Sequence, residues 1–482
     1  MEIRPILMIV GALTATLGCA MLLPAIADAI AGHDDWRVFV SAAAVTVLIG
    51  AGLWASSAGR VNTLTLRQAF LLTTAIWVVL TLFGALPLYW SNIGLSLTDA
   101  VFESMSGITT TGATVIVGLD NSPPGVLLWR GLLQWFGGLG IVVMAIAVLP
   151  MLQVGGMQMF KAEAFETPDK ILPRAAQIAG GMTVIYTVLT AACAIAYWVF
   201  GMSLFDAIAH AMTTVATGGF STRDGSIESF HSVAIDYTAV VFMILGALPF
   251  ALYLVAVQSG NLTRIFKDSQ VRTFLALIAI ATIAMTWLQT RIDIYHGEAA
   301  VRHAVFSVVS VITGTGYATV DYGAWGPFAL TTFFFLTFIG GCTGSTSCGI
   351  KVFRFQVLAL NVTQHVRQML FPHLVHVKRY NGRPLPDEVS ASVQSFVFLY
   401  FASFIVLSIC LSLTGLDPVT ALSGAATVIS NVGPGLGNII GPAGNFQSLP
   451  DSAKWILDVA MVLGRLEFET LLVLLMPSFW RD

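Results

Sequence analysis

The stretch Ser106-Gly107-Ile108-Thr109-Thr110-Thr111-Gly112-Ala113 recurs in altered form three more times along the chain. The later copies are Thr213-Thr214-Val215-Ala216-Thr217-Gly218-Gly219-Phe220, Ser310-Val311-Ile312-Thr313-Gly314-Thr315-Gly316-Tyr317 and Thr427-Val428-Ile429-Ser430-Asn431-Val432-Gly433-Pro434. A glycine holds the seventh position of every copy, and an alanine precedes it by twelve residues, at Ala100, Ala207, Ala304 and Ala421. A turn that only reverses the chain direction would explain one copy, but not the same glycine and alanine positions in four copies. The pattern predicts four pseudo-symmetric repeats around a central axis.

The amino-acid composition excludes a soluble globular protein. Of the 482 residues, 56% are hydrophobic and only 10% are charged, and the mean hydropathy is +0.82. An ordinary soluble domain carries about 25% charged residues because its exterior is largely polar. The net charge of −3 gives no sign of nucleic-acid binding, and we expect the five cysteines to be buried small hydrophobes. The composition therefore predicts an all-α polytopic protein of the lipid bilayer.

Ten stretches are apolar and long enough to be transmembrane helices, which need about 20 residues. They are 6–31, 37–57, 68–90, 126–150, 177–200, 233–257, 272–290, 327–348, 393–413 and 454–477. An even number of spans places both termini on one side of the membrane, and sixteen of the 23 Lys and Arg residues fall on that side. The positive-inside rule then predicts that both termini are cytoplasmic.

Four outer links between these stretches carry the repeated turns, each after a short semi-apolar run. Such runs are too short to span a bilayer and too apolar to be free loops, so we expect re-entrant half-helices. Each repeat then reads helix, half-helix, glycine-rich turn, helix. The predicted divisions are two extra N-terminal helices in 1–59 and repeats in 60–160, 161–265, 266–360 and 361–482.

Four turns of extended backbone around one axis suit a monovalent cation. A cation in a narrow pore loses water, and rings of backbone carbonyls can replace its hydration shell. Glycine allows backbone angles that a Cβ forbids, and the carbonyl end of a half-helix favours a cation by about 0.3–1 kcal/mol. Acidic residues on the outer links either cap and solvate helix ends or concentrate cations at the mouth. The predicted ion-binding residues are Thr109, Thr110, Thr111, Gly112, Ala216, Thr217, Gly218, Gly219, Thr313, Gly314, Thr315, Gly316, Ser430, Asn431, Val432 and Gly433.

The turns at 109–114 and 216–222 resemble the selectivity filters of the Trk/Ktr/HKT superfamily of potassium transporters, and the resemblance covers about residues 60–482. The chain length and the two extra N-terminal helices are similar to the bacterial TrkH branch. Because glycine fills all four columns, the resemblance implies potassium as the transported ion, although the fourth turn at 430–434 departs most from the pattern. It further implies a multi-pass protein of the bacterial inner membrane that is a homodimer and binds a cytosolic ring of nucleotide-binding (NAD or ATP) regulatory subunits. It implies no enzymatic activity and no cofactor bound by this chain.

A second glycine-rich run, Gly340-Gly341-Cys342-Thr343-Gly344-Ser345-Thr346-Ser347-Cys348-Gly349-Ile350-Lys351, interrupts the eighth apolar stretch. It fails the phosphate-loop pattern because Ile350 stands before Lys351 and no Ser or Thr follows. A helical kink is one interpretation, and the resemblance implies another, an intramembrane gating loop at 340–350 that obstructs the pore below the filter and moves for conduction. The predicted gate residues are Gly340, Gly341, Thr343, Gly344, Ser345, Thr346, Ser347, Gly349 and Arg465.

Arg465 lies inside the last apolar stretch. A charge in mid-membrane costs at least about 2.5–3.5 kcal/mol, which makes this residue a functional candidate. One interpretation is a structural pair with Glu467 or Glu469, of which the i,i+4 spacing favours Glu469. The resemblance implies instead an arginine in the cavity under the filter, where it repels cations or holds the loop closed through its carbonyls.

Other functions stay open at this level. One is a sodium-permeable or proton-coupled member of the same superfamily. Another is the potassium-binding subunit of an ATP-driven pump, which also uses four such repeats. A membrane enzyme is poorly supported, because the sequence has no Gly-x-Ser-x-Gly or His-Glu-x-x-His motif.

Overall fold

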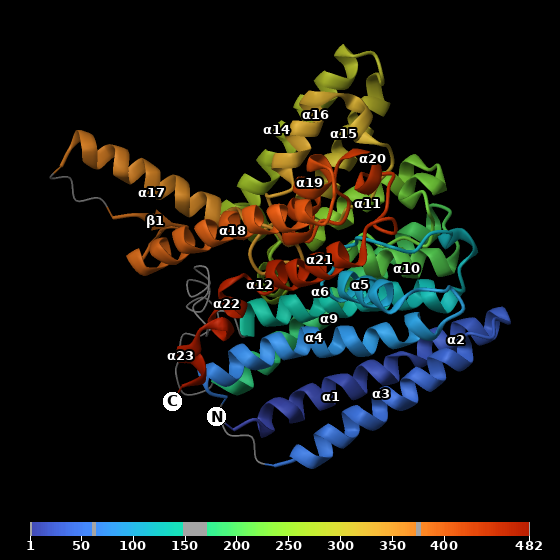
Figure 1. Cartoon of the computed structure of the whole chain (residues 1–482). Helices are drawn as coiled ribbons and strands as arrows, with labels where there is room; N and C mark the ends of the chain where they lie inside the picture. The colour runs from blue at the N-terminus through green and yellow to red at the C-terminus, as the bar shows by residue number, and fades with distance from the viewer. Residues whose placement is uncertain (1, 60–63, 148–170, 373–376, 482) are drawn as a thin grey trace.

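The computed structural model describes residues 2–59, 64–147, 171–372 and 377–481. Within these residues the secondary structure is almost entirely helical, as the composition predicts. The two ends of the chain lie at the same end of the molecule (Figure 1). Three N-terminal helices lie along one side of the molecule and are α1 (Arg4–Ala20), α2 (Leu22–Ala31) and α3 (Trp36–Ser57).

The remaining elements follow one another in four groups of helix, short helix and helix. The first two groups are α4 (Leu66–Trp90), α5 (Leu97–Ile108), η1 (Leu119–Asn121) and α6 (Pro124–Ala147), then α9 (Ile171–Val199), α10 (Leu204–Val215), η4 (Ser226–Phe230), α11 (Val233–Gly246), α12 (Phe250–Ser259) and α13 (Thr263–Lys267). The third is α14 (Ser269–Arg291), α15 (Gly297–Ile312), η5 (Tyr322–Trp325), α16 (Pro327–Leu336) and α17 (Val352–Leu370). The fourth is α18 (Asp387–Leu413), α19 (Pro418–Ile429), α20 (Gly437–Ile440), α21 (Asp451–Arg465), α22 (Glu469–Leu475) and α23 (Pro477–Trp480). The predicted boundary between residues 160 and 161 lies outside the described residues.

Eight of the ten predicted spans correspond to helices of sufficient length and apolarity in the described part of the chain. Seven are single helices or continuous pairs, and the eighth is α11 with α12, which meet at an angle of 88°. Pro249 lies at this bend, where it cannot supply the N–H that would continue the helix. The windows 327–348 and 454–477 are wrong as single helices, because α16 ends at Leu336 and α21 ends at Arg465.

The four half-helices α5, α10, α15 and α19 begin after polar or glycine-containing turns on the outer links. Ser96 and Ser203 cap α5 and α10 by accepting a hydrogen bond from the backbone N–H three residues later. Asp417 caps α19, and hydrogen bonds from Thr420 and Val419 hold the pKa of this carboxyl below its usual range. The caps fix the starts of these three half-helices, whereas α15 begins at Gly297 without a side-chain cap, and all four half-helices end four residues before the repeat glycine.

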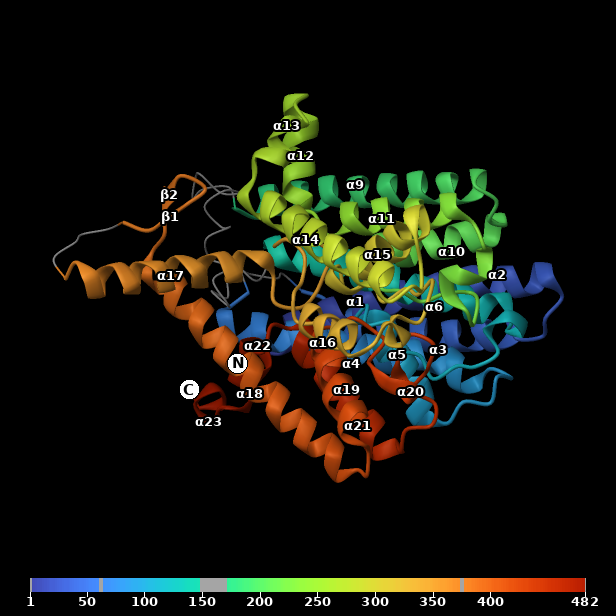
Figure 2. The same cartoon turned by 90° about the horizontal axis from the view of Figure 1, so that it is seen from above.

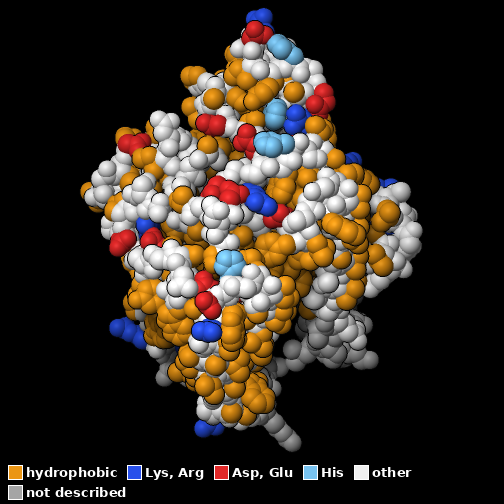
Figure 3. All heavy atoms as spheres, turned by 90° about the vertical axis from the view of Figure 1, so that its right-hand side faces the viewer, with side chains coloured by type: hydrophobic (Ala, Val, Ile, Leu, Met, Phe, Trp, Pro, Cys, Tyr) orange, Lys and Arg blue, Asp and Glu red, His pale blue; other side chains and the backbone are white. Residues whose placement is uncertain are grey.

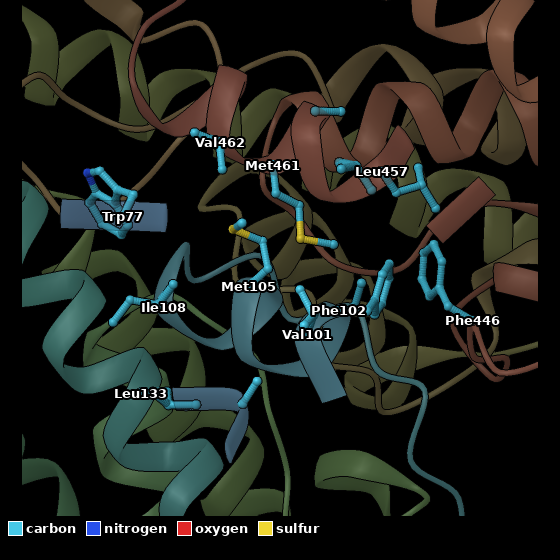
Figure 4. Close-up of a cluster of buried hydrophobic side chains, with 14 of the residues drawn as sticks. Trp77, Val101, Phe102, Met105, Ile108, Leu133, Phe446, Leu457, Met461 and Val462 are labelled. Carbon is cyan, nitrogen blue, oxygen red and sulfur yellow. The ribbon is translucent and has the colours of Figure 1, made fainter. Parts of the chain in front are cut away.

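The first half-helix is enclosed by its neighbours. Figure 4 shows Phe102 and Met105 of α5 facing Leu457 and Met461 of α21. The ring centroids of Phe102 and Phe446 are 5.6 Å apart, and Leu133 of α6 belongs to the same buried cluster. This packing holds α5 between α6 of its own group and α21 of the fourth group, which closes the circle of groups.

One helix with its following hairpin stands apart from the bundle (Figure 2). Helix α17 projects away from the body at the end that holds the chain termini (Figure 2). It leads to a hairpin of β1 (Arg379–Tyr380) and β2 (Arg383–Pro384), in which Tyr380 pairs with Arg383. The Tyr380 ring packs on Phe353, with centroids 5.1 Å apart. The hairpin, whose sequence includes the basic residues Lys378, Arg379 and Arg383, is therefore anchored to the first turn of α17.

Candidate functional site

The four half-helices end in the same backbone geometry. The residue two places before each repeat glycine has a left-handed conformation, with φ of 55° at Thr110, 50° at Thr217, 75° at Gly314 and 52° at Asn431. Its N–H bonds to the carbonyl three residues back, and the next N–H bonds to the carbonyl five residues back, as in Thr111 N to Ser106 O at 2.8 Å. These bonds form a Schellman motif at each half-helix terminus. The four predicted turns are thus one local structure repeated four times.

The four repeat glycines lie next to one another in a closed ring. A Cβ on Gly112 would overlap the carbonyl oxygen of Gly218, and one on Gly219 would overlap that of Thr315. The same holds for Gly316 against Val432 O, and for Gly433 against Thr111 O. Each glycine therefore touches the carbonyl of the next repeat, in the order one, two, three, four and back to one. The φ values of these glycines, 80° to 102°, also disfavour any side chain.

Hydroxyl and amide side chains link the turns. Thr109 and Thr111 share a hydrogen bond of 2.7 Å between hydroxyls, as do Thr313 and Thr315. Asn431 of the fourth turn donates to Thr111 Oγ1 at 2.8 Å and to Met461 O at 3.1 Å. The fourth turn departs most from the repeat sequence, but the side-chain amide of Asn431 joins it to the first turn.

A buried ion pair stands behind the first two turns. Arg130 Nε donates to Glu103 Oε1 at 2.7 Å, and the two side chains are 1% and 0% exposed. Glu103 also accepts from Val115 N at 2.9 Å, and Arg130 donates to Ser221 O at 2.7 Å. Because Val115 and Ser221 follow the turns of repeats one and two, this pair joins the two segments that leave these turns.

This pair was not predicted from the sequence. A signal was available, because Arg130 lies within the apolar window 126–150 and Glu103 lies within a half-helix. Charges in such positions are rare unless they are paired. The sequence does not say which charge pairs with which, since the two residues are 27 positions apart.

The predicted gate residues form a loop beneath the turns. Residues 337–351 are not helical, and Ile339 pairs with Ile350 as an isolated parallel bridge. Thr346 Oγ1 donates to Val215 O at 3.1 Å and accepts from Thr217 Oγ1 at 3.2 Å. The loop therefore contacts the end of α10 and the left-handed residue of the second turn. The segment is a folded loop rather than a kink in a continuous helix.

The bend in the second group holds this loop. Breaking the helix between α11 and α12 frees backbone groups, and the loop uses them. Cys342 N donates to Ala247 O at 3.0 Å, Thr346 N donates to Gly246 O at 3.2 Å, and Phe250 N donates to Gly344 O at 3.0 Å. A Cβ on Gly340 would overlap Cys348 O, so the two arms of the loop approach closely. Non-helical backbone at this depth needs such partners.

Arg465 joins the loop to two helices. Its guanidinium is buried and donates to Gly137 O of α6 at 3.0 Å and to Thr346 O at 3.4 Å. It also contacts Cys348 Sγ and lies over the Trp77 ring, 5.4 Å from the centroid. The structure therefore places this arginine against the Thr346 carbonyl of the loop, and no acid among the residues whose side chains are described forms an ion pair with it. The side chain of Glu469 lies outside the described residues.

Glu467 has a different partner from the one considered in the sequence. It forms an ion pair with Arg354 at the start of α17, and Lys351 Nζ lies 4.0 Å from its other oxygen. Glu467 and Phe468 both have positive φ, 57° and 51°, where α21 breaks before α22. The break between the two helices thus brings an acid to Lys351, which ends the loop, and to Arg354 in the first turn of α17.

The end of the molecule opposite the chain termini is the outer end of the predicted topology. Acidic and histidine side chains gather along the middle of this face (Figure 3). Exposed acids on the outer links include Asp120, Asp224, Glu228, Asp293, Glu298, Asp321, Asp417 and Asp451. Among the described residues, no group of three or more His, Cys, Asp or Glu side chains is placed to hold a metal ion.

Comparisons with known proteins agree with this architecture. The family model described as "TrkH: Cation transport protein" matches residues 36–481. A Trk system potassium uptake protein, TrkI, from Halomonas elongata is 44% identical over 99% of this chain and 97% of its own length. The TrkH protein of Vibrio parahaemolyticus is 40% identical over the full length of both chains. The crystal structure of the potassium transporter TrkH from that organism superposes with a TM-score of 0.92, at 39% identity and full coverage of both chains. The chain therefore belongs to the TrkH family of cation transport proteins.

Proposed function

We propose that this protein carries potassium into a bacterial cell through the ring of four glycine turns. The observation that carries the proposal is the closed contact of each repeat glycine with the carbonyl of the next repeat. Such a ring presents backbone oxygens at a narrow point where a cation sheds water. The relatives are named as potassium uptake proteins, which supports potassium as the ion.

The loop at 337–351 acts as the gate in this proposal. It lies against the second turn through Thr217 and Thr346, and Arg465 donates to the Thr346 carbonyl of the loop. A fixed positive charge at this level also opposes a passing cation. Conduction requires that the loop leave this position, which breaks the arginine contacts.

In this proposal, a partner on the cytoplasmic side moves the gate through α17. The basic hairpin rests on Phe353, two residues after the loop ends at Lys351. A nucleotide-binding regulatory ring that docks here, on a homodimer in the inner membrane with cytoplasmic termini, would act on the loop through α17. The printed names of the relatives refer to a Trk system, which supports partners of this kind.

The test is growth of a potassium-uptake-deficient bacterium on low-potassium medium, with potassium and sodium uptake measured in the same cells. Wild type should restore growth, and Gly112→Ser should admit sodium because its Cβ displaces the Gly218 carbonyl. Gly118→Ser is the matched control, since Gly118 has a similar φ of 80° but open space around its Cβ position. Failure of wild type to restore growth, or equal selectivity of Gly112→Ser and Gly118→Ser, would overturn the filter assignment.

A further inference from the structure

At the position before the repeat glycine, the second filter turn lacks the β-branched side chain that the other three turns carry. The residue before the repeat glycine is Thr111, Thr315 or Val432 in three turns, but Gly218 in the second. Backbone conformation does not require this glycine, because Gly218 is not among the residues with positive φ and the other turns carry β-branched residues here. The reason must lie in a neighbour.

The neighbour is Gln134 of α6. This side chain is fully buried, and a Cβ on Gly218 would overlap its amide group. Gln134 Nε2 donates to Gly218 O at 2.6 Å, and Gln134 Oε1 accepts from Phe220 N at 3.0 Å. The orientation of the amide is fixed by chemistry, since the Phe220 N–H can only donate and so must face the oxygen.

Gln134 therefore pairs with both sides of Gly219 as a strand partner would. One turn earlier on α6, Arg130 donates to Ser221 O, so two side chains of the same helix face hold the second filter segment. Among the described residues, no comparable hydrogen bond reaches the carbonyls of Thr111, Thr315 or Val432. The ring of four carbonyls at this level is thus asymmetric, with one oxygen already sharing a donor.

We propose that Gln134 is a positioning residue for ion selection, which holds the second filter strand and sets the position of the Gly218 carbonyl. Gly218 lacks a side chain so that this amide can lie against it. The proposal rests on the proposed function, because it assigns Gln134 to the filter that selects potassium. It adds that selectivity depends on a residue outside the four turns.

Three variants test the proposal: Gln134→Ala, Gly218→Ala and the double variant. Gln134→Ala removes the amide, and Gly218→Ala pushes the amide aside, so both lose the same pair of bonds. Each single variant should raise the sodium-to-potassium uptake ratio about fivefold, which corresponds to loss of the one hydrogen bond of the pair that reaches a ring carbonyl, from Gln134 Nε2 to Gly218 O. The double variant should also show about fivefold, whereas independent effects would give about 25-fold.

Gln289→Ala is the matched control. Gln289 is equally buried, on α14, and within the described residues its amide has no hydrogen-bond partner. It should keep the wild-type uptake ratio. An unchanged ratio in Gln134→Ala, or a double variant near 25-fold, would overturn the proposal.

Thermal unfolding of the purified variants separates this proposal from the proposed function. If Gln134 and Gly218 act as one interacting pair, the effects of the two substitutions on the midpoint of unfolding are non-additive, whatever ion the protein carries. A wild type without potassium uptake but with this coupling would refute the proposed function alone. If the wild type takes up potassium but the shifts in unfolding midpoint caused by the two substitutions are additive, the proposed role of Gln134 alone is refuted.

Discussion

Replacement of Arg465 by alanine gives the sharpest test of the gate. The arginine holds the loop through Thr346 O and Cys348 Sγ, and it is fixed to the bundle through Gly137 O. If these contacts exist only while the loop obstructs the pore, their loss favours the conducting state. We expect Arg465→Ala to raise potassium flux through the protein in the absence of any activating partner.

The magnitude follows from the contacts. The bond to Gly137 does not involve the loop, and the bond to Thr346 is long at 3.4 Å, so the loop gains about one charge-assisted hydrogen bond from the arginine. Such a bond contributes about 1.5–3 kcal/mol. Since each 1.4 kcal/mol is tenfold in an equilibrium, the conducting fraction should rise about 10- to 150-fold. Removal of the positive charge acts in the same direction.

The assay measures potassium flux, driven by a potassium gradient, into liposomes that contain the purified wild-type or variant protein at equal density. Arg465→Lys keeps the charge but loses the planar fork, so its flux should lie between those of wild type and Arg465→Ala. Cys348→Ala removes one of the two loop contacts and should give a smaller rise. Flux of folded Arg465→Ala that equals or falls below the wild-type value would refute the reasoning.

Two further predictions concern stability. Glu103→Gln leaves the buried Arg130 charge without its partner and should lower the free energy of unfolding by about 3–5 kcal/mol, whereas the double variant with Arg130→Gln should recover part of this loss, as thermal unfolding in detergent would show. Asp417→Asn keeps the cap of α19 but cannot ionise. Because the pKa of Asp417 is lowered in the folded protein, its contribution is present above the unfolded pKa and is lost as pH falls through the folded one, so a scan from pH 7 to pH 3 should show a smaller loss of stability in the variant. A scan that matches wild type would exclude this carboxyl as a source of acid sensitivity.

Much of the fold could be predicted because its signals are local. Bilayer-length apolar runs gave the straight spans, and the window rule failed where a short polar run or a break interrupts the apolar stretch, at 337–351 and after Arg465. A hydropathy average over 20 residues hides such breaks. Pro249 is a sequence signal for the bend in the window 233–257. The sequence does not show that the loop binds the backbone groups that this bend frees.

The four turns were predictable for the same reason. A Schellman end needs a left-handed residue and bonds within one turn of helix, so six or seven neighbouring residues carry the whole pattern. The repeat of glycine at 112, 219, 316 and 433 then indicated four equivalent structures without knowledge of their contacts.

The sequence by itself determined the membrane class, the four repeats and the conformation of each filter turn, because these depend on composition and on residues close together in the chain. Only the tertiary structure decided that Glu103 pairs with Arg130, that Gln134 lies against Gly218, and that Arg465 meets the loop 119 residues before it. A buried polar group must find a partner, but its own sequence does not say where that partner lies. The four turns follow from local backbone chemistry, and the contacts that brace and close them follow from packing.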